Sequence, residues 1–268
     1  MVKKKWGRKN RRFKEPLRKR AKRFLSGALK ISLIVLVLPV SAFSLRAIYR
    51  ELTTTKLLAI NTVEVSGLKR VSKDTVMELA GISEGQNLLS FKAAGAEAGL
   101  RKNPWIKEAR VVRLIPDTVR IELKERIPAV LVKMDEMYVM DEEGVIFKEF
   151  SNSDALDLPV VTGLTAEAMR QDENGLQQGL LELIRCLNAR AGFNSRNVSE
   201  IHIDPAYGFS LYTLNDGVRL DIGKGAFEEK LSAFERIVSS RGGSLAGIEA
   251  MRITGAREAV VRFGSNVL

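Results

Sequence analysis

The amino end of the chain joins a strongly basic segment to an apolar one, and this pair constrains the fold more than any other feature. Thirteen of the first 23 residues are Lys or Arg, and 15 uncharged residues follow at 31–45. At 1.5 Å per residue the uncharged stretch measures only ~22 Å, against the roughly 30 Å hydrocarbon core of a bilayer. Residues 24–49 are long enough, because the side chains of Lys30 and Arg46 can reach the two interfaces. The sequence therefore predicts a basic cytoplasmic tail at 1–23 and a transmembrane helix at 24–49.

A secretory signal peptide is the alternative interpretation of the apolar segment. Val40-Ser41-Ala42 has the small residues that a signal peptidase requires after a short apolar region. A leading segment of about 30 residues is long for a signal peptide, however, and Phe43 and Arg46 continue the helix past this site. We therefore expect an uncleaved anchor. Because basic residues stay on the cytoplasmic side, we expect a single-pass type II membrane protein, with residues 50–268 on the extracytoplasmic side.

The charge of the chain is concentrated at its amino end. The whole chain has a net charge of +11, whereas residues 1–23 alone contain thirteen basic residues and one acidic residue, Glu15. Residues 24–268 are therefore close to neutral, at about −1. A near-neutral folded part gives no reason to propose a nucleic-acid groove, and the positive-inside rule accounts for the basic tail. We expect contact with a membrane and none with nucleic acid.

The chain has one cysteine and one histidine, which excludes several kinds of site. Cys186 cannot form an internal disulfide, and it lies in an apolar helical stripe where we expect a small core residue. His202 alternates with Ile201 and Ile203, which is typical of a solvent-facing strand residue. The sequence contains no P-loop, H-E-x-x-H, G-x-S-x-G or paired-cysteine metal motif. We therefore expect no enzyme, with no catalytic residue, cofactor or metal, although a pair of carboxylates acting on a glycosidic bond stays open.

Residues 56–126 show the order strand, helix, helix, strand, strand. Ser72 is placed to cap the first helix and Gly81 to end it. A second helix is expected at about 91–102. Trp105 follows this helix, and we expect it to be a large buried anchor. The strands are indicated by apolar residues at alternating positions, namely Ile60, Val63, Val65, Val119, Ile121 and Leu123, and by the apolar run with Val111, Val112 and Leu114.

Residues 127–264 predict a second, mostly antiparallel β domain with flanking helices, so the fold class is α+β. Turn signals around Gly144 and at 215–217 join strands into hairpins. Two apolar stripes at helical spacing interrupt the strands, and we expect both to pack in the core. The stripes consist of Leu176, Leu180, Leu183, Ile184 and Leu187, and of Phe227, Leu231, Phe234, Ile237 and Val238. After this domain, a short tail is expected at 265–268.

The second domain ends in a hairpin made by residues 248–253 and 259–263. A domain that ends in this way can present its last strand as an unpaired sheet edge. The backbone N–H and C=O groups of such an edge can pair with an extended segment of a partner, and alternate side chains then supply specificity. This terminal strand carries the functional hypothesis.

Seven sequence blocks follow one another between Val63 and Gly223. They are Val63–Gly67, Asn103–Ile106, Ala109–Val119, Glu125–Ala129, Leu158–Gly163, Ile203–Gly208 and Asp216–Gly223. In this order the blocks resemble the FtsQ/DivIB family of bacterial cell-division proteins, which have one membrane span, a POTRA domain (β-α-α-β-β) and a second β domain. The resemblance implies a non-catalytic scaffold at the division septum that links early and late division proteins. It also implies that the membrane is the inner (cytoplasmic) membrane and that the folded domains are periplasmic. It implies FtsB/FtsL-like and FtsK/FtsW-like membrane proteins as partners, with no cofactor and no small-molecule substrate.

The resemblance also places partner-binding residues on the terminal hairpin. One arginine matches a position that is commonly arginine near the start of this hairpin in the family, although its neighbours depart from the family pattern. The expected contacts are Arg252, Ile253, Ala259, Val261 and Phe263. Two other function classes stay open. One is an enzyme that acts on an envelope polymer, and the other is a POTRA module for outer-membrane protein assembly, which needs further POTRA repeats or a β-barrel.

Overall fold

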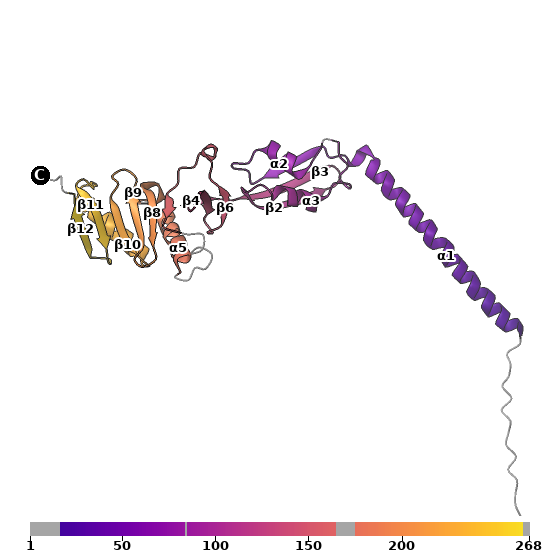
Figure 1. Ribbon diagram of the computed structural model, residues 1–268. Helices are drawn as coiled ribbons and strands as arrows, with labels where there is room; N and C mark the ends of the chain where they lie inside the picture. Colours follow the sequence, from indigo (N-terminus) through magenta and orange to yellow (C-terminus); the bar gives the residue numbers. More distant parts are fainter. Residues whose placement is uncertain (1–16, 84, 165–174, 265–268) are drawn as a thin grey trace, which may run out of the picture. The chain divides into compact units, whose positions relative to one another are not determined.

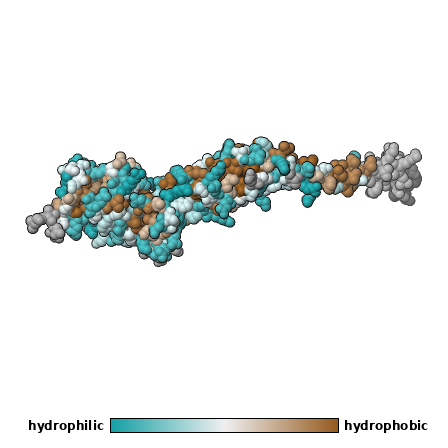
Figure 2. All heavy atoms as spheres, turned by 90° about the horizontal axis from the view of Figure 1, so that it is seen from above, coloured by the Kyte–Doolittle hydropathy of each residue, from teal (hydrophilic) through white to brown (hydrophobic). Residues whose placement is uncertain are grey.

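The structure is a computed structural model that describes residues 17–83, 85–164 and 175–264. Most of the predicted basic tail and all of the predicted tail at 265–268 lie outside these ranges. The first element is a 38-residue helix, α1 (Leu17–Thr54), which continues through Pro39. Residues Leu29–Thr53 of α1 are long and apolar enough to cross a membrane, and none of this segment is buried by the described part of the chain. Figure 2 shows the surface of α1 beside the grey amino-terminal atoms in the brown of hydrophobic residues.

The chain divides into two compact units, and each combines separate segments. The first unit holds α1 and the residues up to Glu64 together with Gly81–Ala96 and Val111–Ile121. The second unit consists of Val65–Ala80, Glu97–Arg110 and the chain from Glu122 onward.

The predicted POTRA region has the expected element order (Figure 1). After a short 3₁₀ helix, η1 (Lys56–Leu58), come β1 (Thr62–Ser66), α2 (Lys73–Ala80), α3 (Ala93–Leu100), β2 (Ile106–Leu114) and β3 (Thr118–Glu125), with the strands ordered β1-β3-β2 in one sheet. The hydroxyl of Ser72 accepts a hydrogen bond from the Thr75 backbone N–H at 3.2 Å, so Ser72 caps α2 as predicted. Gly81 follows α2 with φ +62°, a conformation that glycine adopts without strain.

Trp105 lies just before β2 and is half-buried, so the prediction of a buried anchor is wrong. Its ring meets the edge of the Phe147 ring at 5.2 Å between centroids. The guanidinium of Arg70 lies 4.9 Å from the Trp105 ring centroid, and the ammonium of Lys148 lies 5.4 Å from it. Two cations therefore lie beside one half-buried indole, to whose ring they are attracted. All four residues belong to the second compact unit.

The second domain is built on one sheet of nine strands in the described part of the chain. Its order is β12-β11-β10-β9-β8-β7-β4-β5-β6. The β4/β7, β7/β8 and β10/β11 pairs are parallel and the other pairs are antiparallel, so the prediction of a mostly antiparallel α+β domain is confirmed. The strands are β4 (Pro128–Lys133), β5 (Met137–Asp141), β6 (Ile146–Glu149), β7 (Val160–Thr162), β8 (Val198–Asp204), β9 (Gly208–Thr213), β10 (Arg219–Gly223), β11 (Ile248–Ile253) and β12 (Ala259–Phe263).

Two helices supply much of the core of this domain. They are α5 (Leu176–Ala189) and α6 (Phe227–Ser240), and two short 3₁₀ helices, η2 (Asn152–Asp154) and η3 (Ser195–Asn197), lie in the connections. All five stripe residues of α5 are buried, as are Phe227, Leu231 and Phe234 of α6. Phe227 meets the edge of the Phe209 ring of β9 at 5.6 Å between centroids, which joins α6 to the sheet. The predicted helical stripes are therefore core residues.

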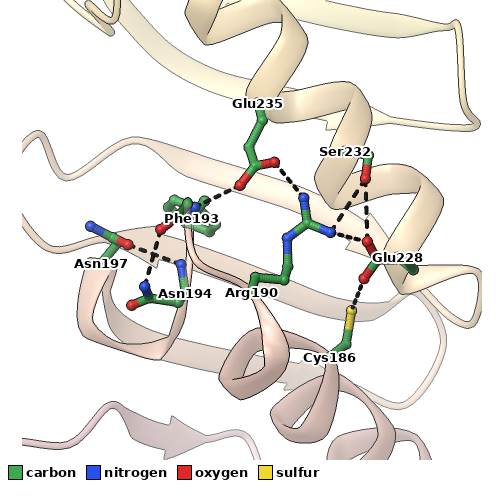
Figure 3. A network of polar contacts seen from close by, with 9 residues as sticks. Cys186, Arg190, Phe193, Asn194, Asn197, Glu228, Ser232 and Glu235 are labelled. Carbon is green, nitrogen blue, oxygen red and sulfur yellow. Dashed lines mark hydrogen bonds and ion pairs between the residues drawn. The ribbon is translucent and has the colours of Figure 1, made fainter.

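Arg190, the residue that caps the carboxyl end of α5, joins this helix to α6 through ion pairs (Figure 3). Its guanidinium contacts the carboxylate of Glu228, and it donates to Glu235 at 2.5 Å. The other oxygen of Glu235 accepts a hydrogen bond from the Phe193 backbone N–H at 2.6 Å. Because the Arg190 side chain is largely buried, these bonds fix the spacing of the two helices more firmly than an exposed ion pair would.

Cys186 is part of the same network and differs from its prediction. It is half-buried, and its Sγ donates a hydrogen bond to Glu228 at 3.1 Å (Figure 3). Burial and this hydrogen bond raise the pKa of the Cys186 thiol to about 11. The residue is therefore a donor at the boundary of the core and not a small apolar residue inside it.

Lys230 of α6 is the one buried lysine in the described part of the chain. Its ammonium donates to the backbone carbonyls of Ile222, Lys224 and Gly225 at 2.8, 2.9 and 2.9 Å. Burial lowers the pKa of this ammonium. Three carbonyl partners replace the water that a charged group loses on burial, and they fix the turn between β10 and α6.

Candidate partner-binding edge

The last strand, β12, lies at one end of the nine-stranded sheet in the described part of the chain (Figure 1). It pairs on one side with β11 in an antiparallel ladder. The predicted position of the terminal strand at a sheet edge is therefore confirmed. Opposite pairs in the ladder are Arg252 with Val260, Ile253 with Ala259, Met251 with Val261, and Ile248 with Phe263.

The outward-facing backbone groups of β12 follow from two hydrogen bonds at its ends. Thr254 N–H donates to the Glu258 carbonyl at 3.1 Å, and Gly264 N–H donates to the Gly247 carbonyl at 3.0 Å. In an antiparallel pair the inward-facing and outward-facing residues alternate. Counting from either end, Ala259, Val261 and Phe263 direct their N–H and C=O groups away from β11. These are three of the five residues that the sequence predicted as contacts.

The side chains along β12 divide between the two faces of the sheet. Ala259 and Val261 are half-buried and pack against the core on the helix-covered face. Val260 lies on the opposite face and is 67% exposed. Phe263 is more than half exposed, and the guanidinium of Arg241 lies 5.9 Å from its ring centroid. A partner at this edge would therefore meet exposed apolar surface as well as free backbone groups.

Arg252 is placed beside this edge, on β11, with a side chain that is 66% exposed. Its Nε lies 3.8 Å from the carboxylate of Asp221 on β10. Asp221 also accepts a hydrogen bond from Ser210 at 2.8 Å and pairs with Arg219, whose Nε lies 3.1 Å away. The pairing orients Arg252 along the open face of the sheet and leaves its remaining N–H donors accessible. A shallow groove at this point is lined by Arg219, Asp221, Ala250, Arg252, Val260 and Arg262.

The structure does not bring Ile253 to the surface. This side chain is 2% exposed and belongs to the core, and its backbone lies on β11 between two other strands. We therefore leave Ile253 out of the candidate surface. The sequence analysis overlooked Val260, although alternation along the strand places it on the same face as Arg252.

No candidate metal site is evident in the described residues. They contain no group of three or more His, Cys, Asp or Glu side chains placed to hold a metal ion. His202 of β8 is 43% exposed, and its Nδ1 lies 2.8 Å from the hydroxyl of Thr162. The prediction that His202 faces solvent is confirmed.

Comparisons with known proteins cover both domains. The family model of the FtsQ-type POTRA domain matches residues 58–126, and that of the FtsQ/DivIB cell-division protein C-terminal domain matches residues 129–253. The cell division protein FtsQ of Geobacter sp. (strain M21) is 39% identical over 188 residues, which cover 69% of this chain and 69% of that protein. The chain belongs to the FtsQ/DivIB family.

Two further relatives support the assignment to the FtsQ/DivIB family. The cell division protein FtsQ of Geotalea daltonii is 35% identical over 193 residues, which cover 71% of this chain and 70% of that protein. The cell division protein FtsQ of Syntrophotalea carbinolica is 30% identical over 238 residues, which cover 86% of this chain and 83% of that protein. The FtsQ/DivIB assignment, together with α1, makes the chain a single-pass membrane protein of the cell-division machinery. The match to the C-terminal family model ends at Ile253, so β12 lies beyond it.

Proposed function

We propose that this FtsQ/DivIB protein is a non-catalytic scaffold of the division septum. Its amino end lies in the cytoplasm and its two folded domains lie outside the cytoplasm. It links early and late division proteins by protein–protein contacts. Small bitopic proteins of the FtsB/FtsL kind add a strand to β12, and the proposed partners also include proteins of the FtsK/FtsW kind. The family assignment favours this role over an envelope-polymer enzyme and over an outer-membrane assembly module.

The edge of β12 is the observation that supports strand addition. Ala259, Val261 and Phe263 each offer one N–H and one C=O to a partner segment, by the alternation set at the ends of the strand. A net gain of about 0.5–1.5 kcal/mol for each hydrogen bond is enough for a specific but reversible contact. Val260 and Arg252 add side-chain contacts on the open face, where alternate residues of the incoming strand would meet them.

Photo-crosslinking in membranes tests the proposed edge. A photoreactive amino acid is placed at Val261 or Phe263, and Tyr207 serves as the matched control because it is an exposed apolar residue in a turn between β8 and β9. We expect adducts with small bitopic division proteins from positions 261 and 263 and none from position 207. Equal adducts at all three positions, or none on β12, would contradict strand addition.

A reporter fusion tests the proposed orientation. A reporter that is active only outside the cytoplasm is fused after Leu268. The thirteen basic residues at 1–23 predict an active reporter, because the positive-inside rule retains the amino end in the cytoplasm. Activity of a cytoplasm-only reporter at the same position would overturn the topology.

A further inference from the structure

Two aliphatic side chains of the first compact unit are largely exposed to solvent, although burial of apolar side chains is favourable. Leu57 of η1 is 82% exposed, and Ile115, in the turn between β2 and β3, is 76% exposed. Single exposed aliphatic residues are common on protein surfaces, so exposure alone carries no conclusion. The position of these two residues is what distinguishes them.

Leu57 lies immediately beyond the segment that can cross the membrane. That segment ends at Thr53, four residues before Leu57. Four residues reach at most about 14 Å even when fully extended. The headgroup region on each side of the hydrocarbon core is itself roughly 5–8 Å deep. The Leu57 side chain is therefore held at or next to the headgroups of the leaflet in which α1 ends.

Asn87 ties the folded part of the first unit to the end of α1. Its side-chain amide donates to the backbone carbonyls of Leu52 at 2.9 Å and Thr55 at 3.3 Å. The Leu88 backbone N–H donates to the Leu58 carbonyl at 2.7 Å. The last carbonyls of a helix lack partners within the helix, so the bond from Asn87 to Leu52 satisfies a group that otherwise needs water. The segment around Asn87 is thus placed next to the membrane by hydrogen bonds, and not only by chain connection.

The turn that carries Ile115 is fastened to the same region. The backbone N–H groups of Asn61 and Thr62 both donate to the Asp117 carbonyl, at 3.0 and 3.3 Å. Arg113, just before the turn, reaches the carbonyls of Leu89 and Phe91. All of these residues belong to the first compact unit, which also contains α1. Leu57 of η1 and the turn with Ile115 therefore both belong to segments of the first unit that hydrogen bonds link to the chain just after α1.

We propose that Leu57 and Ile115 insert into the headgroup region of the leaflet in which α1 ends, and that they hold the first folded unit against the lipid surface. The short connection from α1 makes lipid the surface that these side chains meet first. The exposed Lys56 lies next to Leu57, and its positive charge is attracted to anionic lipid phosphates. Aliphatic side chains flanked by basic ones are typical of surfaces that rest in the interface plane.

The test uses the full chain in nanodiscs that contain phosphatidylglycerol. Cys186→Ser removes the native thiol and keeps a hydroxyl donor toward Glu228. Leu57→Cys, Ile115→Cys or Tyr207→Cys then carries one environment-sensitive fluorophore. Tyr207 is the matched control, because at 82% exposed it is as open as Leu57 but lies in the second unit. Quenching is measured with aqueous iodide and with lipids that carry a spin label near the headgroup.

At positions 57 and 115 we expect blue-shifted emission, iodide quenching several-fold weaker than at position 207, and strong quenching by the spin-labelled lipid. Iodide quenching at position 115 equal to that at position 207 would overturn the proposal. Protection of position 115 in native membranes, but not in nanodiscs that hold this chain alone, would show that a protein and not lipid covers it, and would also overturn the proposal.

Discussion

Val261 on β12 lies opposite Met251 on β11, at a position where neither residue directs its backbone N–H to the other. Proline at 261 therefore removes no hydrogen bond from the ladder, but it removes a donor that an added strand would use. We expect Val261→Pro to leave the thermal midpoint nearly unchanged. It should weaken partner capture by about 1 kcal/mol or more, roughly fivefold, as measured by pull-down from membranes.

Val260→Pro is the matched control for this prediction. Val260 is the adjacent residue and directs its N–H inward to Arg252, so proline there breaks the hairpin itself. We expect Val260→Pro to lower the free energy of unfolding by about 1 kcal/mol or more. Equal destabilisation by both substitutions, or unchanged capture with Val261→Pro, would contradict the assignment of outward-facing groups.

Arg252 offers a second test of the same surface. Its ion pair with Asp221 is long, at 3.8 Å, and largely solvated, so it contributes less than about 1 kcal/mol to folding. A contact at the centre of an interface typically contributes more than that to binding. We expect Arg252→Ala to keep the thermal midpoint and to weaken capture of the bitopic partner about tenfold, measured by titration with the purified partner. Arg185→Ala, an exposed arginine on α5, is the control and should bind normally. Equal loss with both variants would point to general charge attraction.

The elements that the sequence predicts well are those whose pattern is local. The stripes of α5 and α6 repeat at helical spacing and require burial wherever the helices pack, so residues such as Leu183 and Phe234 could be assigned to the core beforehand. The alternation along β11 likewise shows that Arg252 and Ile253 face opposite sides. It does not show which side the helices cover, and for this reason Ile253 was assigned to the wrong surface.

Features that depend on contacts between distant segments of the chain could not be predicted from the sequence. Trp105 is only half-buried, and Arg70 and Lys148, far away in the sequence, lie beside its ring. Lys230 is buried because three carbonyls of a preceding turn converge on it, and nothing in the pattern of α6 indicates this. Such contacts are fixed by tertiary packing, which local spacing does not encode.

Lys230 should be a strong contributor to the stability of the second domain. Lys230→Met keeps the length of the side chain but leaves three carbonyls without their charged donor, with a cost of about 2–3 kcal/mol. We expect a lower thermal midpoint by calorimetry or circular dichroism. Lys224→Met is the control, because Lys224 is exposed and donates to one carbonyl, that of Pro205. A midpoint shift no larger than that of the control would mean that water replaces the lost donor.

The Cys186 thiol should react slowly in the folded protein. Burial, followed by the hydrogen bond to Glu228, raises its pKa to about 11. Since only the thiolate is alkylated, a pKa of about 11 lowers the rate near neutral pH about 100-fold relative to an ordinary thiol. We expect slow labelling by iodoacetamide with a pH midpoint near 11, and fast labelling in urea. Glu228→Gln removes a negative neighbour and should accelerate labelling of the folded protein. A folded chain that reacts as fast as the unfolded one would show that Cys186 is neither shielded nor bonded to Glu228.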